Sequence, residues 1–340
     1  AVDIVECQML DDRKTAILSA VVHEYIATAQ PVGSSHLVDA PGVGVSSATV
    51  RNELAHLEQE GFLVQPHTSA GRIPTDKGYR YFVDNLTTPG PLDSAQTAQI
   101  GDFFTAAHGR LEEMLHQTSD LLATLTNSTS LVVGPTPAEV EVRSVQLVPL
   151  SSTHATVVVV FSNGAVESST IELSDGCDDE RLADASAVLS HNLVGKKLSQ
   201  VTTIDGVENI AVAALAAMAR DAVFQVSSDD HVYVGGTSSV AASFDAVEVV
   251  RNILHTLEQQ FVVVSLVRDV LDRGMSVAIG GEHGVEPLAA CSIVVSPVVV
   301  EGEHVGSVGV LGPTRMNYPQ ALATVGLVSE RLGTRLEEGS

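Results

Sequence analysis

The sequence is poor in cysteine and in positive charge. Its 340 residues include 3 Cys and no Trp, and 18 Lys and Arg stand against 42 Asp and Glu, so the formal net charge is −24. An odd number of widely spaced cysteines, with no C-x-x-C pair, argues against a disulfide framework and against a structural zinc site. We therefore expect a reducing, cytoplasmic environment.

Long hydrophobic runs are also missing. The longest apolar stretches, 261–267 and 293–300, are shorter than the roughly 18 to 20 residues that a helix needs to cross a bilayer. The first residues show no basic region followed by an apolar core, the pattern of a signal peptide. Because 44% of the residues are hydrophobic, the chain can nevertheless bury a core. These features predict a folded protein of two or three domains with no membrane partner.

Signatures of an active site are lacking as well. His108 and His116 are eight residues apart, whereas two imidazoles that share an ion on one helix are four apart. The glycines within 306–312 match neither the dinucleotide fingerprint nor the P-loop, and they favour a tight hairpin or close backbone packing. The acidic residues at 178–180 have no nucleophile motif nearby and are typical of a solvated helix start. We expect no catalytic residues, no metal ion and no cofactor.

The first 90 residues have the pattern of a DNA-binding module. Apolar residues recur every three to four positions in 13–29, which predicts an amphipathic helix. A short second helix is predicted from Ser34 or Ser35, and a third over 46–60. Strand signals on both sides of a polar, glycine-containing tip at 66–72 predict a hairpin. Three helices followed by a basic hairpin is the order of a winged helix-turn-helix.

The third of these helices carries the candidate base contacts. On a helical wheel, Val50, Leu54 and Leu57 share one side, and Arg51 and Asn52 lie on the other. Arg can donate two hydrogen bonds to guanine, and Asn can pair in the same way with adenine. Hydroxyl groups near helix starts and the cations of the hairpin suit contacts with phosphate. The candidate DNA-binding residues are Ser34, Ser35, Ser46, Ser47, Thr49, Arg51, Asn52, His67, Thr68, Ser69, Arg72, Lys77 and Arg80. The same pattern also fits a surface helix with polar decoration.

The remaining residues alternate between helical and strand patterns. A stretch with linker composition at 87–91 precedes a long helical segment over 94–126. An Asn-Gly pair at 163–164 predicts a hairpin between two strands. Strands are predicted at 131–133, 145–148, 156–161, 166–173, 293–300 and 305–311, and further helices at 178–225, 246–273 and from 314 to about 336.

Four strings of the sequence, at 31–35, 46–54, 65–80 and 312–318, closely resemble the HrcA family of heat-inducible transcription repressors. Their spacing and the total length fit the family too, so the resemblance spans nearly the whole chain. It implies an α+β multidomain fold: an N-terminal winged helix-turn-helix, a GAF-like α/β domain and an inserted α+β dimerisation domain. We expect the winged helix at 1–88, the GAF-like domain at 89–174 and 265–340, and the inserted domain at 175–264.

The resemblance also implies a function. A homodimer would bind double-stranded DNA at an inverted-repeat operator of chaperone genes and repress their transcription. It would depend on the GroE chaperonin for its active state, so that heat-damaged proteins that occupy GroE would relieve repression. Two alternatives remain open: a regulator that responds to a small molecule bound by the GAF-like domain, and an enzyme with an appended DNA-binding head.

Overall fold

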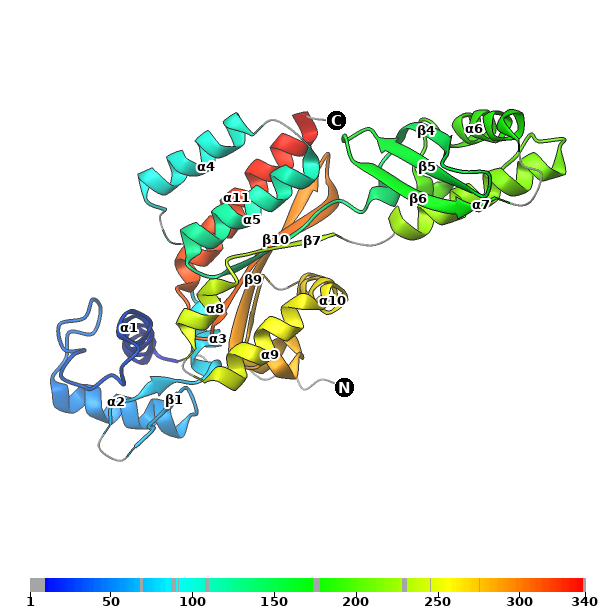
Figure 1. Cartoon of the computed structure of the whole chain (residues 1–340). Coiled ribbons are helices and arrows are strands. Elements are labelled where there is room, and N and C mark those ends of the chain that lie inside the picture. Colours follow the sequence, from blue (N-terminus) through cyan, green and yellow to red (C-terminus); the bar gives the residue numbers. More distant parts are fainter. Residues whose placement is uncertain are drawn as a thin grey trace.

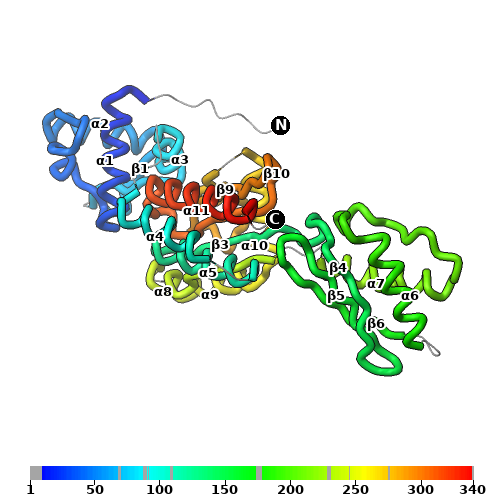
Figure 2. Tube along the Cα trace, turned by 90° about the horizontal axis from the view of Figure 1, so that it is seen from above, coloured from blue at the N-terminus to red at the C-terminus, as the bar shows by residue number. Residues whose placement is uncertain are grey.

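The computed structural model describes residues 10–67, 70–86, 90, 92–107, 110–173, 178–227, 231–244, 246–274 and 276–338. It contains three parts that follow one another in space (Figures 1 and 2). The head comprises residues 10–86, the central domain comprises 92–133 and 231–338, and the inserted unit comprises 137–227. The central domain is built on a five-stranded sheet and the inserted unit on a three-stranded sheet.

The head consists of helices and a short hairpin. Its elements are α1 (Asp12–Thr28), α2 (Ser47–Gln59), β1 (Leu63–Val64), β2 (Ile73–Pro74) and α3 (Asp76–Asp84). The Asp11 side chain caps α1 by accepting from the Lys14 backbone, and the chain leaves this helix at Ala29 with a φ of 53°. The first helix, the helix over 46–60 and the hairpin follow in the predicted order, but the predicted second helix is missing and α3, which was not predicted, follows the hairpin.

The short helix predicted from Ser34 or Ser35 is absent from the structure, and this prediction is wrong. A series of turns takes its place, with bonds from the His36 amide to the Gly33 carbonyl and from the Ala40 amide to the Leu37 carbonyl, both 3.2 Å. Prolines and glycines flank this segment, and the few residues between them form too few hydrogen bonds to offset the free energy of starting an α-helix. Leu37 is still buried, as expected.

Five antiparallel strands form the sheet of the central domain, in the order β7-β3-β10-β9-β8. They are β3 (Thr129–Val133), β7 (Val232–Gly235), β8 (Val277–Ile279), β9 (Cys291–Val300) and β10 (Glu303–Pro313). A Cβ at Gly306 would lie 2.4 Å from the Val133 carbonyl oxygen, and one at Gly309 would lie 2.9 Å from that of Val294. The expected close backbone packing at 306–312 is therefore confirmed.

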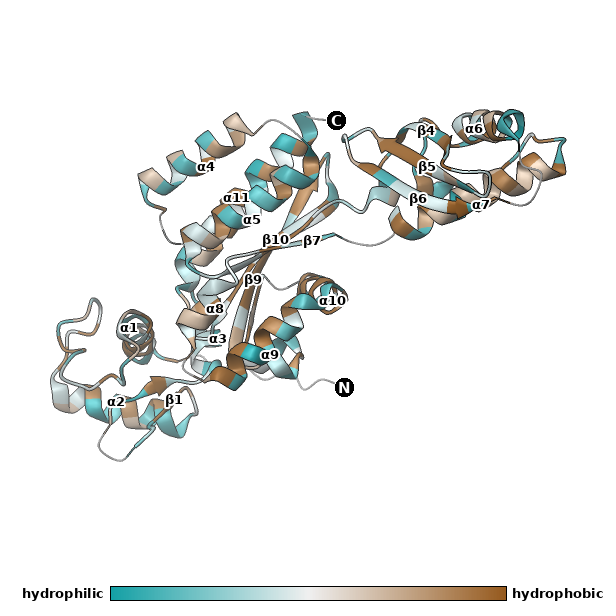
Figure 3. Cartoon of the chain, viewed as in Figure 1, coloured by the Kyte–Doolittle hydropathy of each residue, from teal (hydrophilic) through white to brown (hydrophobic). Residues whose placement is uncertain are grey.

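Helices cover both faces of this sheet. They are α4 (Ser94–Ala106), α5 (Leu111–Thr126) and α11 (Tyr318–Glu338) on one face, and α8 (Ser238–Ser243), α9 (Val247–Glu258) and α10 (Gln260–Asp272) on the other (Figure 1). Successive residues of β9 divide between the two cores: Val294 and Val298 pack with α5 and α11, and Ile293 and Val295 with α9 and α10. Strands covered on both faces are hydrophobic along their length, as Figure 3 shows for the centre of the sheet.

Two segments predicted as single helices are each divided in two. Ala107 has an extended backbone and ends α4, and α5 begins four residues later at Leu111. Gln259, with φ −88° and ψ 84°, separates α9 from α10. Apolar spacing continues across both breaks, so periodicity alone did not reveal them.

The inserted unit packs two helices against one face of its own sheet, in the order β4-β5-β6. Its elements are η1 (Pro137–Glu139), β4 (Val142–Pro149), β5 (His154–Phe161), β6 (Val166–Glu172), α6 (Asp179–Leu193), η2 (Leu198–Gln200) and α7 (Ile210–Ser227). These elements enclose a separate hydrophobic core that includes Val159, Phe161 and Leu189. The hairpin predicted at 163–164 is confirmed by the pairing of Val160 with Val166.

The division between central domain and inserted unit differs from the expected ranges. The strands within 142–172, expected in the GAF-like domain, pair with one another in the inserted unit. The helices within 238–258, expected in the insertion at 175–264, cover the central sheet. Val133 pairs with Val232, so the chain leaves the central sheet after β3 and returns beside it at β7.

By length and composition, α7 is apolar enough to cross a membrane. In the structure, however, one side of it packs on the core of the inserted unit through Val212, Leu215 and Val223. This contact is that of a core helix in a folded domain.

Candidate nucleic-acid interface

Helix α2 is seated in the head by one apolar face. Val50, Leu54 and Leu57 are buried in the head's core, as the wheel predicted. Ser46 caps the helix: its Oγ accepts from the Thr49 amide at 3.3 Å. The buried face and the cap together fix which residues point outward.

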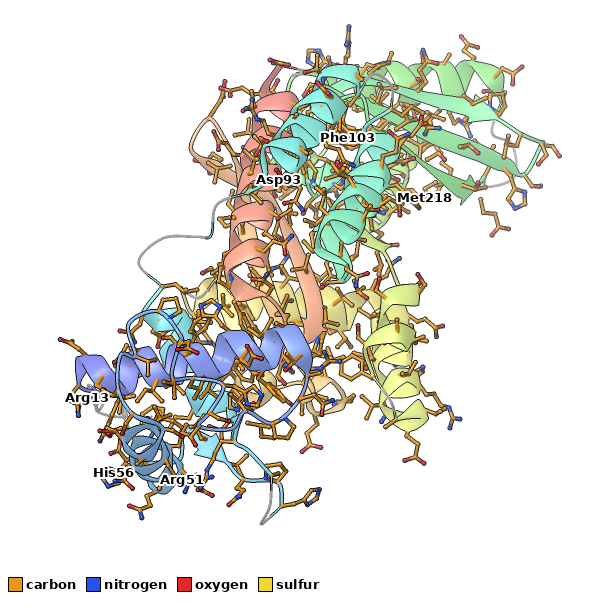
Figure 4. All side chains as sticks on the ribbon, turned by 90° about the vertical axis from the view of Figure 1, so that its left-hand side faces the viewer. Arg13, Arg51, His56, Asp93, Phe103 and Met218 are labelled. Carbon is orange, nitrogen blue, oxygen red and sulfur yellow. The ribbon has the colours of Figure 1, made fainter. Side chains whose placement is uncertain are left out.

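The outward face of α2 is polar and carries the predicted base contacts. Arg51 and Asn52 are exposed, and so are Ala48, His56 and Gln59. Figure 4 shows Arg51 and His56 on the side of α2 that is turned away from α1. The structure thus places Arg51 and Asn52 side by side on an exposed helix surface. Ala48 lies next to them, and its small side chain would let another molecule come close to the helix.

The carboxylates at this helix are held by cations of the head. Arg13 lies 3.5 Å from Glu53, Lys14 lies 2.7 Å from Glu60, and the guanidinium of Arg72 lies 2.8 Å from Glu58. The hydrogen bond with Glu60 raises the pKa of the Lys14 ammonium group. These pairs offset the negative charges that would otherwise repel a polyanion near Arg51.

The predicted hydroxyl residues gather at the start of α2. Ser46, Ser47 and Thr49 lie in its first turn, and the Oγ atoms of Ser34 and Ser47 are 3.1 Å apart. Ser35 is exposed in the preceding turns, and Ser34 is half-buried. A helix start lined with hydroxyls and free amides is a favourable place for a phosphate oxygen.

At the tip of the hairpin, only part of the prediction is visible. His67 is exposed, whereas Thr68 and Ser69 lie outside the described residues. Arg72 lies at the base of the hairpin, where its Nε and Nη2 atoms donate to Glu58 on α2. Its role in the structure is to brace the hairpin against the helix.

The other two predicted phosphate-binding cations contact the protein itself. The Lys77 ammonium group donates to the Glu60 carbonyl at 2.8 Å and lies 4.3 Å from the centre of the Phe62 ring. Arg80 projects from α3 toward the central domain, where it pairs with Glu282. The short run of positive charge at 65–80 is therefore largely engaged in the fold.

His56 and Gln59 were absent from the candidate set although the structure exposes both on the outward face of α2. Their signal was available in the sequence, because they follow Asn52 and Ala55 by four residues on the same helix. The pairing of Arg13 with Glu53 had no such signal, since the two lie 40 residues apart.

Comparisons with known proteins show the family of the chain. Residues 112–322 match the family model described as the HrcA protein C terminal domain. The chain is 37% identical to the heat-inducible transcription repressor HrcA of Rhodococcus jostii, over 96% of this chain and 99% of the relative. It is 36% identical to the protein of the same name from Nocardioides sp., over 97% of this chain and all of the relative.

One solved structure shares the overall fold. The crystal structure of a hypothetical protein covers 97% of this chain and 99% of its own, with a TM-score of 0.62 and 23% identity. The family model and the full-length relatives establish that the chain belongs to the HrcA family of heat-inducible transcription repressors.

Proposed function

We propose that α2 enters the major groove of an operator and reads its bases through Arg51 and Asn52. The observation that carries this proposal is the outward face of α2, on which both residues are exposed while the carboxylates at Glu53 and Glu58 are held by Arg13 and Arg72. Arg51 would donate to the O6 and N7 atoms of guanine, and Asn52 would pair with adenine. Ala48 would allow the helix to lie deep in the groove.

Around this helix, hydroxyl and amide groups would hold the DNA backbone. Ser35, Ser46, Ser47 and Thr49 are the proposed phosphate contacts at the start of α2, with Ser34 positioning Ser47. His67 would approach the neighbouring backbone from the hairpin. Since Arg72, Lys77 and Arg80 have partners within the protein, their part would be to orient the head.

We assign the three parts of the molecule as follows. The head is a winged helix-turn-helix, in which the hairpin β1–β2 is the wing. The central domain is GAF-like, and the inserted unit is the dimerisation domain. A twofold dimer would present two α2 helices to successive major-groove half-sites, so its operator would be an inverted repeat, located at chaperone genes.

Heat would act on the amount of active repressor. A marginally stable repressor that needs GroE to refold would be lost when heat-damaged proteins occupy the chaperonin. A change of about 1 to 2 kcal/mol in stability alters such a population several-fold. Residues 91–340 carry 12 basic and 31 acidic residues, so the body of the protein would repel stray DNA and leave binding strongly dependent on salt.

Fluorescence anisotropy with a labelled inverted repeat from a chaperone operon tests this function. We expect Arg51→Ala to weaken specific binding by about 1 to 3 kcal/mol while affinity for random DNA changes little. Arg110→Ala is the matched control, because it removes one exposed charge from the central domain, where Arg110 pairs with Glu112. Equal losses in both variants, or no preference of the wild type for the repeat, contradict the proposal.

A second arm of the experiment tests the thermal mechanism. After a heat pulse, binding should be lost, and it should return when GroE and ATP are added but not when ATP is added alone. Recovery without the chaperonin, or no loss on heating, would argue against dependence on GroE.

Regulation by a small molecule is a second candidate because the central domain contains a groove of about 500 Å³. It lies between α10 and the β9–β10 hairpin and combines apolar residues such as Val264 and Leu271 with His304. Native mass spectrometry of the purified protein is the direct test. A bound metabolite that changes operator affinity would support this function.

A further inference from the structure

The last helix of the head, α3, is docked on one end of the central sheet. The Tyr79 ring packs against the ring of Tyr318, the first residue of α11, with centroids 5.7 Å apart. Both tyrosines are buried, and the apolar residues of the head and of this end of the central domain form one continuous core. Two of the strings that carry the family resemblance, 65–80 and 312–318, therefore meet in space.

An ion pair between Arg80 and Glu282 stabilises the contact of α3 with the central domain. Arg80 Nε donates to Glu282 Oε1 at 2.9 Å, and Arg80 Nη2 donates to the Val277 carbonyl at 2.8 Å. Glu282 Oε2 in turn accepts from the Ile279 amide at 2.8 Å. The guanidinium thus bridges α3 to strand β8 (Val277–Ile279) and to the short helix η3 (Gly280–His283), and its planar donor geometry fixes the direction of approach.

Close contacts at two glycines place α3 between the head and the central domain. Gly280 has a φ of +54°, and a Cβ there would lie 2.2 Å from Asp76 Oδ2. On the other side of α3, a Cβ at Gly78 would lie 2.3 Å from the Phe62 carbonyl oxygen. Helix α3 therefore lies against the backbone of the hairpin at Gly78 and, through the Asp76 carboxylate, against η3.

The docked helix is connected directly to the end of α2. The Lys77 ammonium donates to the Glu60 carbonyl, and Thr75 Oγ1 donates to the Gly61 carbonyl at 2.7 Å. Both carbonyls lie where α2 ends. A rotation of α3 on the central domain would consequently change the direction of α2.

We propose that the joint formed by Tyr79, Arg80, Glu282 and Tyr318 is the positioning element that sets the direction of α2 relative to the central domain. It determines which spacing of two half-sites the paired heads can occupy together. This inference rests on the proposed DNA-binding function. Arg80 and Glu282 are positioning residues in it: they touch no base and act through the orientation of the head.

The key experiment compares Glu282→Gln with Asp84→Asn. Asp84 is the matched control because it also pairs with Arg80, at 3.3 Å, but from within α3. The glutamine amide introduced by Glu282→Gln keeps the shape of the side chain and its capacity to accept from Ile279, and it removes the charge that holds Arg80. Binding is measured to a single half-site and to inverted repeats whose spacer varies one base pair at a time.

The wild type and Asp84→Asn should show one preferred spacer. In Glu282→Gln, single half-site affinity should be unchanged, and the advantage of the preferred repeat over the half-site should fall about tenfold, because two heads no longer fit both half-sites together. The optimum should also broaden. An unaltered spacer profile in Glu282→Gln, or an equal loss at the single half-site, overturns the inference.

A measurement without DNA separates this inference from the function on which it rests. Spin labels on Gln59→Cys in α2 and Gln117→Cys in α5, in full-length chains whose native cysteines are replaced by alanine, report the distance between head and central domain. We expect a narrow distribution in the wild type and a broad one in Glu282→Gln. If the wild type binds no repeat, the proposed function fails. The distance distributions then still show whether the joint fixes the orientation of the head on the central domain.

Two further variants keep the test informative. Should Glu282→Gln not fold, Arg80→Lys keeps the charge and loses the paired N–H donors, and it should broaden the distribution as well. The Tyr79 hydroxyl is buried without a hydrogen-bond partner among the described residues. Tyr79→Phe removes this unpaired group, so it should leave the distribution as narrow as in the wild type or narrower. A broader one contradicts the joint as described.

Discussion

The head and the inserted unit are attached to the central domain in opposite ways. The head shares its hydrophobic core with one end of the central domain and is tied to it by Arg80 and Glu282. The inserted unit has a core of its own and joins the central domain through the two chain crossings beside Val133 and Val232 and through Glu167, whose Oε1 lies 3.4 Å from His231 Nε2. A shared core couples the orientation and the stability of two parts of a protein, whereas two chain crossings and one partly exposed ion pair couple them only weakly. We therefore expect a destabilising mutation in the head to destabilise the central domain too, and one in the inserted unit to affect that unit alone.

The largest loss of stability is expected from a cavity in the core of the inserted unit. Phe161 is fully buried there, and Phe161→Ala should destabilise this unit by about 3 to 5 kcal/mol. Hydrogen exchange should accelerate in β4–β6, α6 and α7, while the amides of α2 and β9 stay protected. Faster exchange in the head would contradict the independence of the inserted unit.

A comparable cavity in the head should destabilise the adjoining part of the central domain as well. Leu57 is fully buried in the core that the head shares with the central domain, and Leu57→Ala should cost about 2 to 5 kcal/mol. Exchange should accelerate in α3, in β8 and at the start of α11 as well as in α2. If the loss stops at the boundary of the head, the two parts do not share one cooperative core.

A matched pair of helix caps tests the same contrast at lower energy. Ser46 caps α2 in the head, and Asn209 Oδ1 accepts from the Ala211 amide at 3.0 Å to cap α7 in the inserted unit. Ser46→Ala and Asn209→Ala should each cost about 1 kcal/mol in urea unfolding. We expect only the first to accelerate exchange at β8. If both variants accelerate hydrogen exchange at β8 equally, the head is coupled to the central domain no more strongly than the inserted unit is.

The smallest effect concerns pH at the joint. Burial lowers the pKa of the His283 imidazole, whose Nδ1 accepts from the Val285 amide at 3.2 Å and whose Nε2 lies 3.0 Å from the Leu288 carbonyl. The folded state therefore binds fewer protons than the unfolded state. The contribution of His283 to the free energy of unfolding is complete above about 6.5, the pKa of a histidine in the unfolded chain. It declines as the pH falls below that value. Urea unfolding at pH 7.5 and 5.5 should show a smaller decline in His283→Gln than in the wild type, and an equal decline would exclude this contribution.

Local features of the molecule were predictable from the sequence, and non-local ones were not. The helix at 46–60, its buried face and its serine cap follow from spacing within one short segment. The strands within 142–172 were found, but strand periodicity does not tell which sheet a strand joins, because register is set between distant segments. For the same reason Arg80 was expected at phosphate, although its partner lies 202 residues further along the chain.

The order of the strands has a consequence for synthesis of the chain. Strand β3 is buried at every position and lies between β7 and β10 in the finished sheet. The ribosome must add about 170 residues after Val133 before β10 begins at Glu303, which takes roughly 10 to 35 s at typical bacterial rates of translation. During that interval one edge of a strand that is buried in the folded protein has no native neighbour, so each newly made molecule passes through a period in which self-association competes with folding.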